Sequence, residues 1–145
     1  MNILKLELTH FGKFHLKTIT FTSGLNIVYG KNEAGKSTIH AFVRSMLFGI
    51  PDTEEGNERY SHYLPWETPH DFCGRMWIKK DDKVYRIERN FLRPQPTVRV
   101  FDDETGESLQ PAKQHLRQIL SGLTETSYLN TICIEQLKSA HNPQT

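Results

Sequence analysis

The chain carries at residues 30–38 the stretch Gly30-Lys31-Asn32-Glu33-Ala34-Gly35-Lys36-Ser37-Thr38, which matches GxxxxGK[ST], the pattern of a phosphate-binding loop. The backbone N–H groups around the two glycines of such a loop form a concave site for a polyphosphate. Lys36 then brings a mobile positive charge to the β and γ phosphates, and Ser37 offers a hydroxyl ligand to Mg²⁺. We assign the nucleotide contacts to Gly30, Asn32, Glu33, Ala34, Gly35, Lys36, Ser37 and Thr38.

The residues on either side of this stretch are those that a phosphate-binding loop requires. Residues 25–29 are short, apolar and β-branched, which predicts a buried parallel strand. After the loop, apolar residues follow at the spacing of one helix face: Ile39, Phe42, Val43, Met46 and Leu47. Gly49 and Pro51 are placed to end that helix. The order of strand, glycine loop and helix predicts a site for a nucleoside triphosphate.

Length and composition place few further bounds on the function. The chain has 145 residues, which suits one domain, and a formal net charge of +1, which predicts no partner by itself. Lys5 and Glu7 interrupt the apolar start, so we expect no signal peptide, and no apolar run approaches the length of a membrane span. Cys73 and Cys133 have no CxxC spacing. We therefore expect a cytoplasmic protein.

The remaining chain alternates between strand and helix patterns. Residues 3–8 and 19–21 predict two strands separated by a turn around Gly12. Residues 51–71 contain three prolines and an acidic run, and we expect a long loop there, with aromatic residues that pack back on the sheet. Residues 72–101 predict antiparallel strands with a tight turn at Asp81-Asp82, and a third strand that contains Val98 and Val100.

The C-terminal third predicts two helices and a strand. Pro111 opens a helix that Gly122 is placed to end, and Thr124 is a candidate N-cap of a short second helix. Residues 132–136 then form a short apolar strand that ends in Gln136. We divide the chain into a core at 1–50, a loop at 51–71, an antiparallel meander at 72–110, and helices with a final strand at 111–145.

This succession of segments resembles the N-terminal part of the ATPase head of the ABC-type coiled-coil ATPases, the SMC, RecF and SbcC-like proteins. The resemblance rests on the Phe11-Gly12-Lys13-Phe14 turn, the Gly24-Leu25-Asn26-Ile27-Val28 strand and the phosphate-binding loop, and it is particularly close to the bacterial SbcC/YhaN-like branch. It implies an α/β P-loop NTPase fold, as the N-terminal lobe of an ABC-type head. That lobe holds a mixed sheet, a P-loop helix and an antiparallel β subdomain.

The resemblance also implies roles for two further residues. Gln136 matches the place of the Q-loop glutamine, which reaches Mg²⁺ and the attacking water, and an amide offers a metal or water an acceptor without adding negative charge. Lys13 stands near the point where relatives place a basic residue beside the nucleotide, although an arginine is usual there. We therefore expect ATP and Mg²⁺ as ligands, with Lys36 and Gln136 catalytic, Ser37 and Gln136 on the metal, and Lys13 on the nucleotide.

Several parts of such an ATPase do not occur in this sequence. After Gln136 there is no apolar strand ending in Asp-Glu, no Ser-Gly-Gly signature and no coiled-coil heptad. We expect a C-terminal lobe and coiled coil of the same protein, together with a second head, to supply them for hydrolysis. Expected partners are that second head, a nuclease subunit and DNA, with no membrane.

Alternatives remain at this point. A nucleotide-gated dimerisation module without hydrolysis and a P-loop kinase or GTPase share the phosphate-binding loop, although the guanine-reading Asn-Lys-x-Asp does not occur. Eight basic residues of the meander are candidate DNA contacts: Arg75, Lys79, Lys80, Lys83, Arg86, Arg89, Arg93 and Arg99. A solvated strand face is the favoured interpretation of these charges, with Arg89 as a structural arginine.

Overall fold

The computed structural model of the chain describes residues 2–21, 33–121, 124 and 125, and for residues 33–36 it describes the backbone alone. Its strands are β1 (Asn2–Phe11), β2 (Phe14–Thr20), β3 (Cys73–Lys80), β4 (Lys83–Asn90), β5 (Thr97–Asp102) and β6 (Ser108–Leu109). Its helices are α1 (Glu33–Phe48), α2 (Glu54–Tyr63) and α3 (Ala112–Leu120). Within this described part of the chain, no helix is long and apolar enough to cross a membrane.

The six strands form one sheet in the order β2-β1-β3-β4-β5-β6, and every neighbouring pair is antiparallel. The predicted antiparallel strands of residues 72–101 are confirmed. They are continuous with the N-terminal hairpin, because β1 pairs with β3 along most of its length. The parallel strand predicted at 25–29 lies outside the described residues, so the mixed character of the sheet remains a prediction.

Two tight turns fix the register of the hairpins. Gly12 and Lys13 connect β1 to β2, and Gly12 has a φ of 60°, in the left-handed region that favours glycine. Asp81 and Asp82 connect β3 to β4 with φ angles of 52° and 65°. Positive φ at both central residues is the geometry of a type I′ turn, whose twist matches that of the strands it joins.

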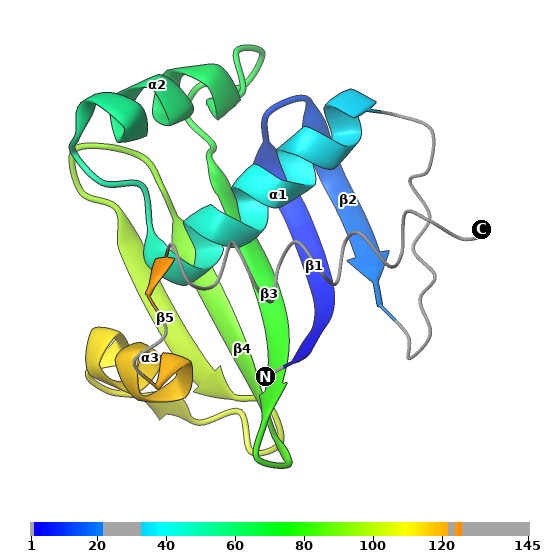
Figure 1. The fold of residues 1–145 in the computed structure, drawn as a ribbon, viewed down its shortest axis with the longest axis vertical. Coiled ribbons are helices and arrows are strands. Elements are labelled where there is room, and N and C mark those ends of the chain that lie inside the picture. The colour runs from blue at the N-terminus through cyan, green and yellow to red at the C-terminus, as the bar shows by residue number, and fades with distance from the viewer. Residues whose placement is uncertain (1, 22–32, 122–123, 126–145) are drawn as a thin grey trace.

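Helix α1 covers one face of this sheet and forms the core with it (Figure 1). The side chains of Ile39, Phe42, Val43, Met46 and Leu47 are all buried, as their spacing predicted. They pack against Leu6, Leu8 and Phe11 of β1 and Met76 and Ile78 of β3. Gly74 of β3 makes the close approach of Phe42 feasible, because a Cβ there would lie 2.3 Å from the ring atom Cε1 of Phe42.

The prediction of a loop across residues 51–71 is wrong at its centre, where α2 occupies Glu54–Tyr63. Its ten residues include a glycine and five charged or histidine side chains, so they show little helical apolar pattern. The helix is instead stabilised from its ends. Thr53 caps it by accepting a hydrogen bond from the N–H of Gly56 at 3.0 Å, and two glutamates occupy the first turn, where the helix dipole favours them.

The aromatic residues of this segment behave in two ways. Tyr60 and Tyr63 pack against the core, with ring centroids 5.2 Å from Phe72 and 5.2 Å from Phe11 respectively, as the sequence suggested. Trp66 is 84% exposed and does not pack on the sheet.

The boundaries of α3 differ from the prediction at one end. The helix begins directly after Pro111, as expected, but it ends at Leu120 with Ser121 as its C-cap. Ser121 has a φ of 52° and its N–H donates to the carbonyls of Arg117 and Gln118. A serine therefore takes the left-handed position that we had assigned to Gly122, which lies outside the described residues. The short helix after Thr124 and the strand at 132–136 also fall outside them, apart from residues 124 and 125.

Candidate functional site

The phosphate-binding stretch enters α1 earlier than predicted. We expected the helix to follow the glycine loop, but α1 begins at Glu33, three positions after Gly30. Glutamate and alanine are good helix formers, and a glutamate suits the positive end of the helix dipole. The first N–H groups of a helix have no intrahelical partner, and in α1 these belong to residues 33–36. The motif residues therefore place their backbone donors at a helix N-terminus, where anions bind.

The two hydroxyl residues of the motif differ in their exposure to solvent. Ser37 is exposed, whereas Thr38 is 5% exposed and turned toward the sheet. Consecutive residues of a helix point about 100° apart, so Ser37 can face solvent while Thr38 faces the protein. An exposed hydroxyl on the first turns of α1 has the hard oxygen donor that Mg²⁺ prefers. The described residues thus fit the metal role predicted for Ser37.

The hairpin turn that carries Lys13 lies against this end of α1. A Cβ on Gly12 would be 3.4 Å from the Cγ2 atom of Thr38 and 3.2 Å from the ring of Tyr63. The N–H of Gly12 also donates to the carbonyl of Tyr63 at 2.6 Å, which ties the turn to the end of α2. Lys13 itself is exposed. The structure therefore brings its turn beside the motif helix, and a contact between Lys13 and a nucleotide stays a prediction.

The other assigned residues are not described. Gly30, Asn32 and Gln136 lie outside the described residues, and the side chains of Glu33, Ala34, Gly35 and Lys36 are likewise outside them. Their predicted roles therefore stay predictions. Among the residues that the structure does describe, no group of three His, Cys, Asp or Glu side chains is arranged to hold a metal ion.

The opposite end of α1 is held by Arg89 of β4. Its Nε donates to the carbonyl of Met46 at 2.6 Å and its Nη2 to that of Leu47 at 3.4 Å, so a cation caps carbonyls that the helix leaves unpaired. Burial lowers the pKa of this guanidinium to about 10. Gly49 then turns the chain with a φ of 79°. The prediction that Arg89 is a structural arginine is confirmed.

Most of the other basic residues of the meander are engaged with the protein itself. Arg75 pairs with Glu7, Lys83 with Asp102, and Arg86 with Glu88 and Asp103. Lys80 donates to the carbonyl of Ile119 at 2.6 Å at the end of α3. These contacts agree with the interpretation as a solvated strand face. Lys79 and Arg99 are exposed, with no ion pair among the described residues.

An ion-pair cluster between α1 and α2 was missed by the sequence analysis. Arg44 contacts both Glu55 of α2 and Glu125, and it bonds Glu55 at 3.3 Å through both of its terminal nitrogens. Arg59 of α2 lies 3.5 Å from Glu55 and donates to the hydroxyl of Ser45 at 3.3 Å. Burial, and then the charge of Arg44, lower the pKa of Arg59. No local sequence pattern predicts this cluster, because its members come from three separate segments.

Comparison with known proteins identifies the family of the chain. A family model described as an AAA domain matches residues 1–140. The chain is 43% identical over 56 residues to the uncharacterized protein YhaN of Bacillus subtilis. The aligned stretch makes up 38% of this chain and 6% of that protein. The chain is 26% identical over 146 residues to the DNA double-strand break repair Rad50 ATPase of Thermococcus kodakarensis. This alignment covers 94% of this chain and 15% of that protein.

The chain therefore spans only a small part of the curated relatives that it matches, at most 15% of either. The family model, by contrast, covers nearly all of the chain. The chain belongs to the AAA-domain family, in which it resembles the N-terminal part of the ATPase head of SMC-like proteins.

Proposed function

We propose that this chain is the ATP-binding half of an ATPase of the SMC/SbcC-like group. The observation that carries the proposal is that residues 33–37 of the GxxxxGK[ST] stretch form the start of α1, with an exposed Ser37 and the Gly12-Lys13 turn beside it. In this proposal the N–H groups of residues 33–36 and the Lys36 ammonium hold the phosphates. Ser37 would hold Mg²⁺, which would neutralise charge on the phosphates, and Gln136 would orient the attacking water.

Hydrolysis in this proposal requires further parts. An acidic residue that holds Mg²⁺ and a group that caps the partner's ATP are general needs of such ATPases, and we assign them to a C-terminal lobe and a second head. Two heads would then close on ATP and act as a clamp on DNA. A nuclease would be a further partner. The Rad50 relative is a DNA double-strand break repair ATPase by name, and this supports the choice of group.

The test is calorimetric titration of the chain with a non-hydrolysable ATP analogue and with GTP, each with and without Mg²⁺. We expect Mg²⁺-dependent binding that favours the adenine nucleotide. Lys36→Ala should weaken it by about ten- to a hundredfold, since a charge-assisted contact is worth roughly 1.5–3 kcal/mol. Ser37→Ala should weaken it mainly when Mg²⁺ is present, and Lys79→Ala, on the far end of β3, is the matched control.

Three results would contradict the proposal. If Lys36→Ala and Ser37→Ala bind as tightly as the parent chain, the site is elsewhere. Tighter GTP binding would favour a GTPase, and rapid ATP turnover by the chain alone would show that no second lobe is needed. Dimerisation with ATP but no turnover when both lobes are present would instead favour a nucleotide-gated dimerisation module.

A further inference from the structure

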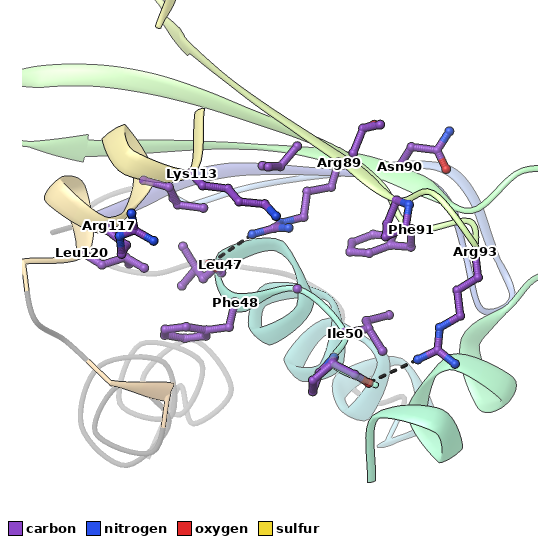
Figure 2. A pocket seen from close by; sticks show the side chains of 16 residues that line it. Leu47, Phe48, Ile50, Arg89, Asn90, Phe91, Arg93, Lys113, Arg117 and Leu120 are labelled. Atoms are coloured by element: carbon purple, nitrogen blue, oxygen red, sulfur yellow. Dashed lines mark hydrogen bonds between the residues drawn. The ribbon is translucent and has the colours of Figure 1, made fainter. Parts of the chain in front are cut away.

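A cavity of about 360 Å³ lies between the C-terminal end of α1, strands β4 and β5, and helix α3. This volume is within the range of about 300–1,000 Å³ that is usual for ligand pockets. Apolar side chains of α1, β5, α3 and the residue that follows β4 line it and are here called its floor: Leu47, Phe91, Val98, Leu116 and Leu120. Figure 2 shows that the side chains lining the cavity lie between α3 on one side and the α1–α2 connection on the other. It lies at the end of α1 opposite to the phosphate-binding motif.

The charged residues of this cavity are all of one sign. Arg89, Arg93, Lys113 and Arg117 line it, and none of the described aspartates or glutamates does. Arg93 is committed at the rim, where it donates to Asn57 at 2.7 Å and to the carbonyl of Pro51 at 3.2 Å. The remaining three cations surround the apolar floor, and Figure 2 shows Lys113 extending from α3 toward Arg89.

The placement of Lys113 is unfavourable for the fold itself. It lies in the first turn of α3, at the positive end of the helix dipole, and that turn holds no acidic residue. It is also four positions before Arg117, and like charges at this spacing repel each other on a helix. Arg89 and Arg117 each have a structural explanation: Arg89 caps α1, and Arg117 lies in the last turn of α3, where the helix dipole favours a positive charge. Lys113 has none, because it forms no ion pair among the described residues.

We propose that this cavity docks an acidic peptide segment of a partner protein, with a bulky apolar side chain on the floor and carboxylates against Lys113, Arg117 and Arg89. An anion there would offset the repulsion between cations that line the same cavity. The apolar floor fits a side chain, whereas single-stranded nucleic acid is usually held by aromatic platforms along an open groove. Residues 126–145 of this chain contain one acidic residue, Glu135, so they do not match the charge of the site.

The test uses the whole chain and a defined probe, the capped peptide Asp-Phe-Leu-Asp with an uncharged dye, followed by fluorescence anisotropy. Its matched control is Asn-Phe-Leu-Asn, which has the same shape without the charges. We expect the acidic peptide to bind about tenfold or more tightly than the neutral one at low salt. Lys113→Glu should weaken its binding by at least about tenfold and Lys113→Gln by less, while Lys79→Glu, on the exposed end of β3, leaves it unchanged.

Circular dichroism of each variant confirms that the exposed substitutions leave the fold intact. Equal binding of the two peptides, or binding that Lys113→Glu leaves unaltered, would overturn the proposal. So would the failure of the acidic peptide to bind, or its displacement by a short single-stranded oligonucleotide, which would assign the charges to nucleic acid. None of these results depends on whether the chain binds ATP.

Discussion

At the scale of single residues, the contact between α1 and the sheet depends on the lack of a side chain at Gly74. We predict that Gly74→Ala destabilises the chain by about 1–3 kcal/mol, because the new methyl group would overlap the ring of Phe42 and lie 2.9 Å from the carbonyl oxygen of Glu7. Urea unfolding followed by far-ultraviolet circular dichroism measures the change.

The control for Gly74 is a second substitution that removes part of the overlap. Phe42→Leu should cost less in the Gly74→Ala background than in the parent chain, since the two residues are in contact and their effects are not additive. If the two costs add, the overlap with Phe42 is not the cause of the loss.

A second residue, Asp102, makes the stability of the chain depend on pH. Lys83 donates a hydrogen bond to Asp102 at 3.0 Å and, together with the N–H groups of Glu104 and Thr105, holds the pKa of the Asp102 carboxyl below its ordinary value. A carboxyl whose pKa is lower in the folded state binds fewer protons there than in the unfolded chain. The contribution of this carboxyl to the free energy of unfolding is therefore complete at neutral pH and is lost as the pH falls below about 4 toward the folded-state pKa.

We predict that Asp102→Asn lowers the urea midpoint at pH 7 and has a smaller effect at pH 3. Asp52→Asn, in the exposed connection between α1 and α2, is the control and should change neither value much. An equal loss at both pH values would show that the carboxylate charge is not what matters at this position.

At the scale of elements, α2 depends on its cap more than on its sequence pattern. Replacing Thr53 by alanine should destabilise the chain by about 1 kcal/mol, because the N–H of Gly56 loses its acceptor. Thr53→Ser keeps the hydroxyl and should stay close to the parent chain in the same urea experiment. If both variants lose equal stability, the methyl group of Thr53 matters and the hydrogen bond does not.

The helices show which elements a sequence predicts well. Helix α1 follows from the spacing of Ile39, Phe42, Val43, Met46 and Leu47, since a buried helix needs a continuous apolar face. Helix α2 was missed because its stabilising contacts are the Thr53 cap, the ion pair of Arg59 with Glu125, and the packing of its tyrosines against the core. The cap is a single local contact and the other contacts join residues distant in sequence, so none of them gives residues 51–71 a helical periodicity.

At the scale of the whole molecule, the positions of most strands were predictable and their order was not, although β2 spans Phe14–Thr20 where a strand was predicted at 19–21, and β6 was not predicted. Alternating patterns and turn residues locate β1, β3, β4 and β5, because each signal is contained within a few residues. The pairing of β1 with β3 joins segments some seventy positions apart and leaves no local trace. The same limit applies to the Arg44 and Arg59 cluster and to the cations around Lys113, which only the folded chain brings together.

The candidate site was accessible from the sequence for a different reason. A phosphate-binding loop is one continuous segment, so its chemistry can be read from adjacent residues and its helix is confirmed by the structure. The exposure of Ser37 and the proximity of the Gly12-Lys13 turn could not be predicted in this way. They follow from how the hairpin packs on α1.

The position of β1 between β2 and β3 also bears on the order in which the chain assembles. Strands β3, β4 and β5 are joined by short connections, so their pairing closes small loops at little cost in chain entropy. Strand β1 has its hairpin partner β2 beside it but can meet β3 only after the intervening helices have been brought in. We therefore expect the β3–β5 meander to form early and docking of the β1–β2 hairpin to limit the folding rate. During synthesis on the ribosome the first strand must wait, unpaired on one edge, until residue 80 has emerged.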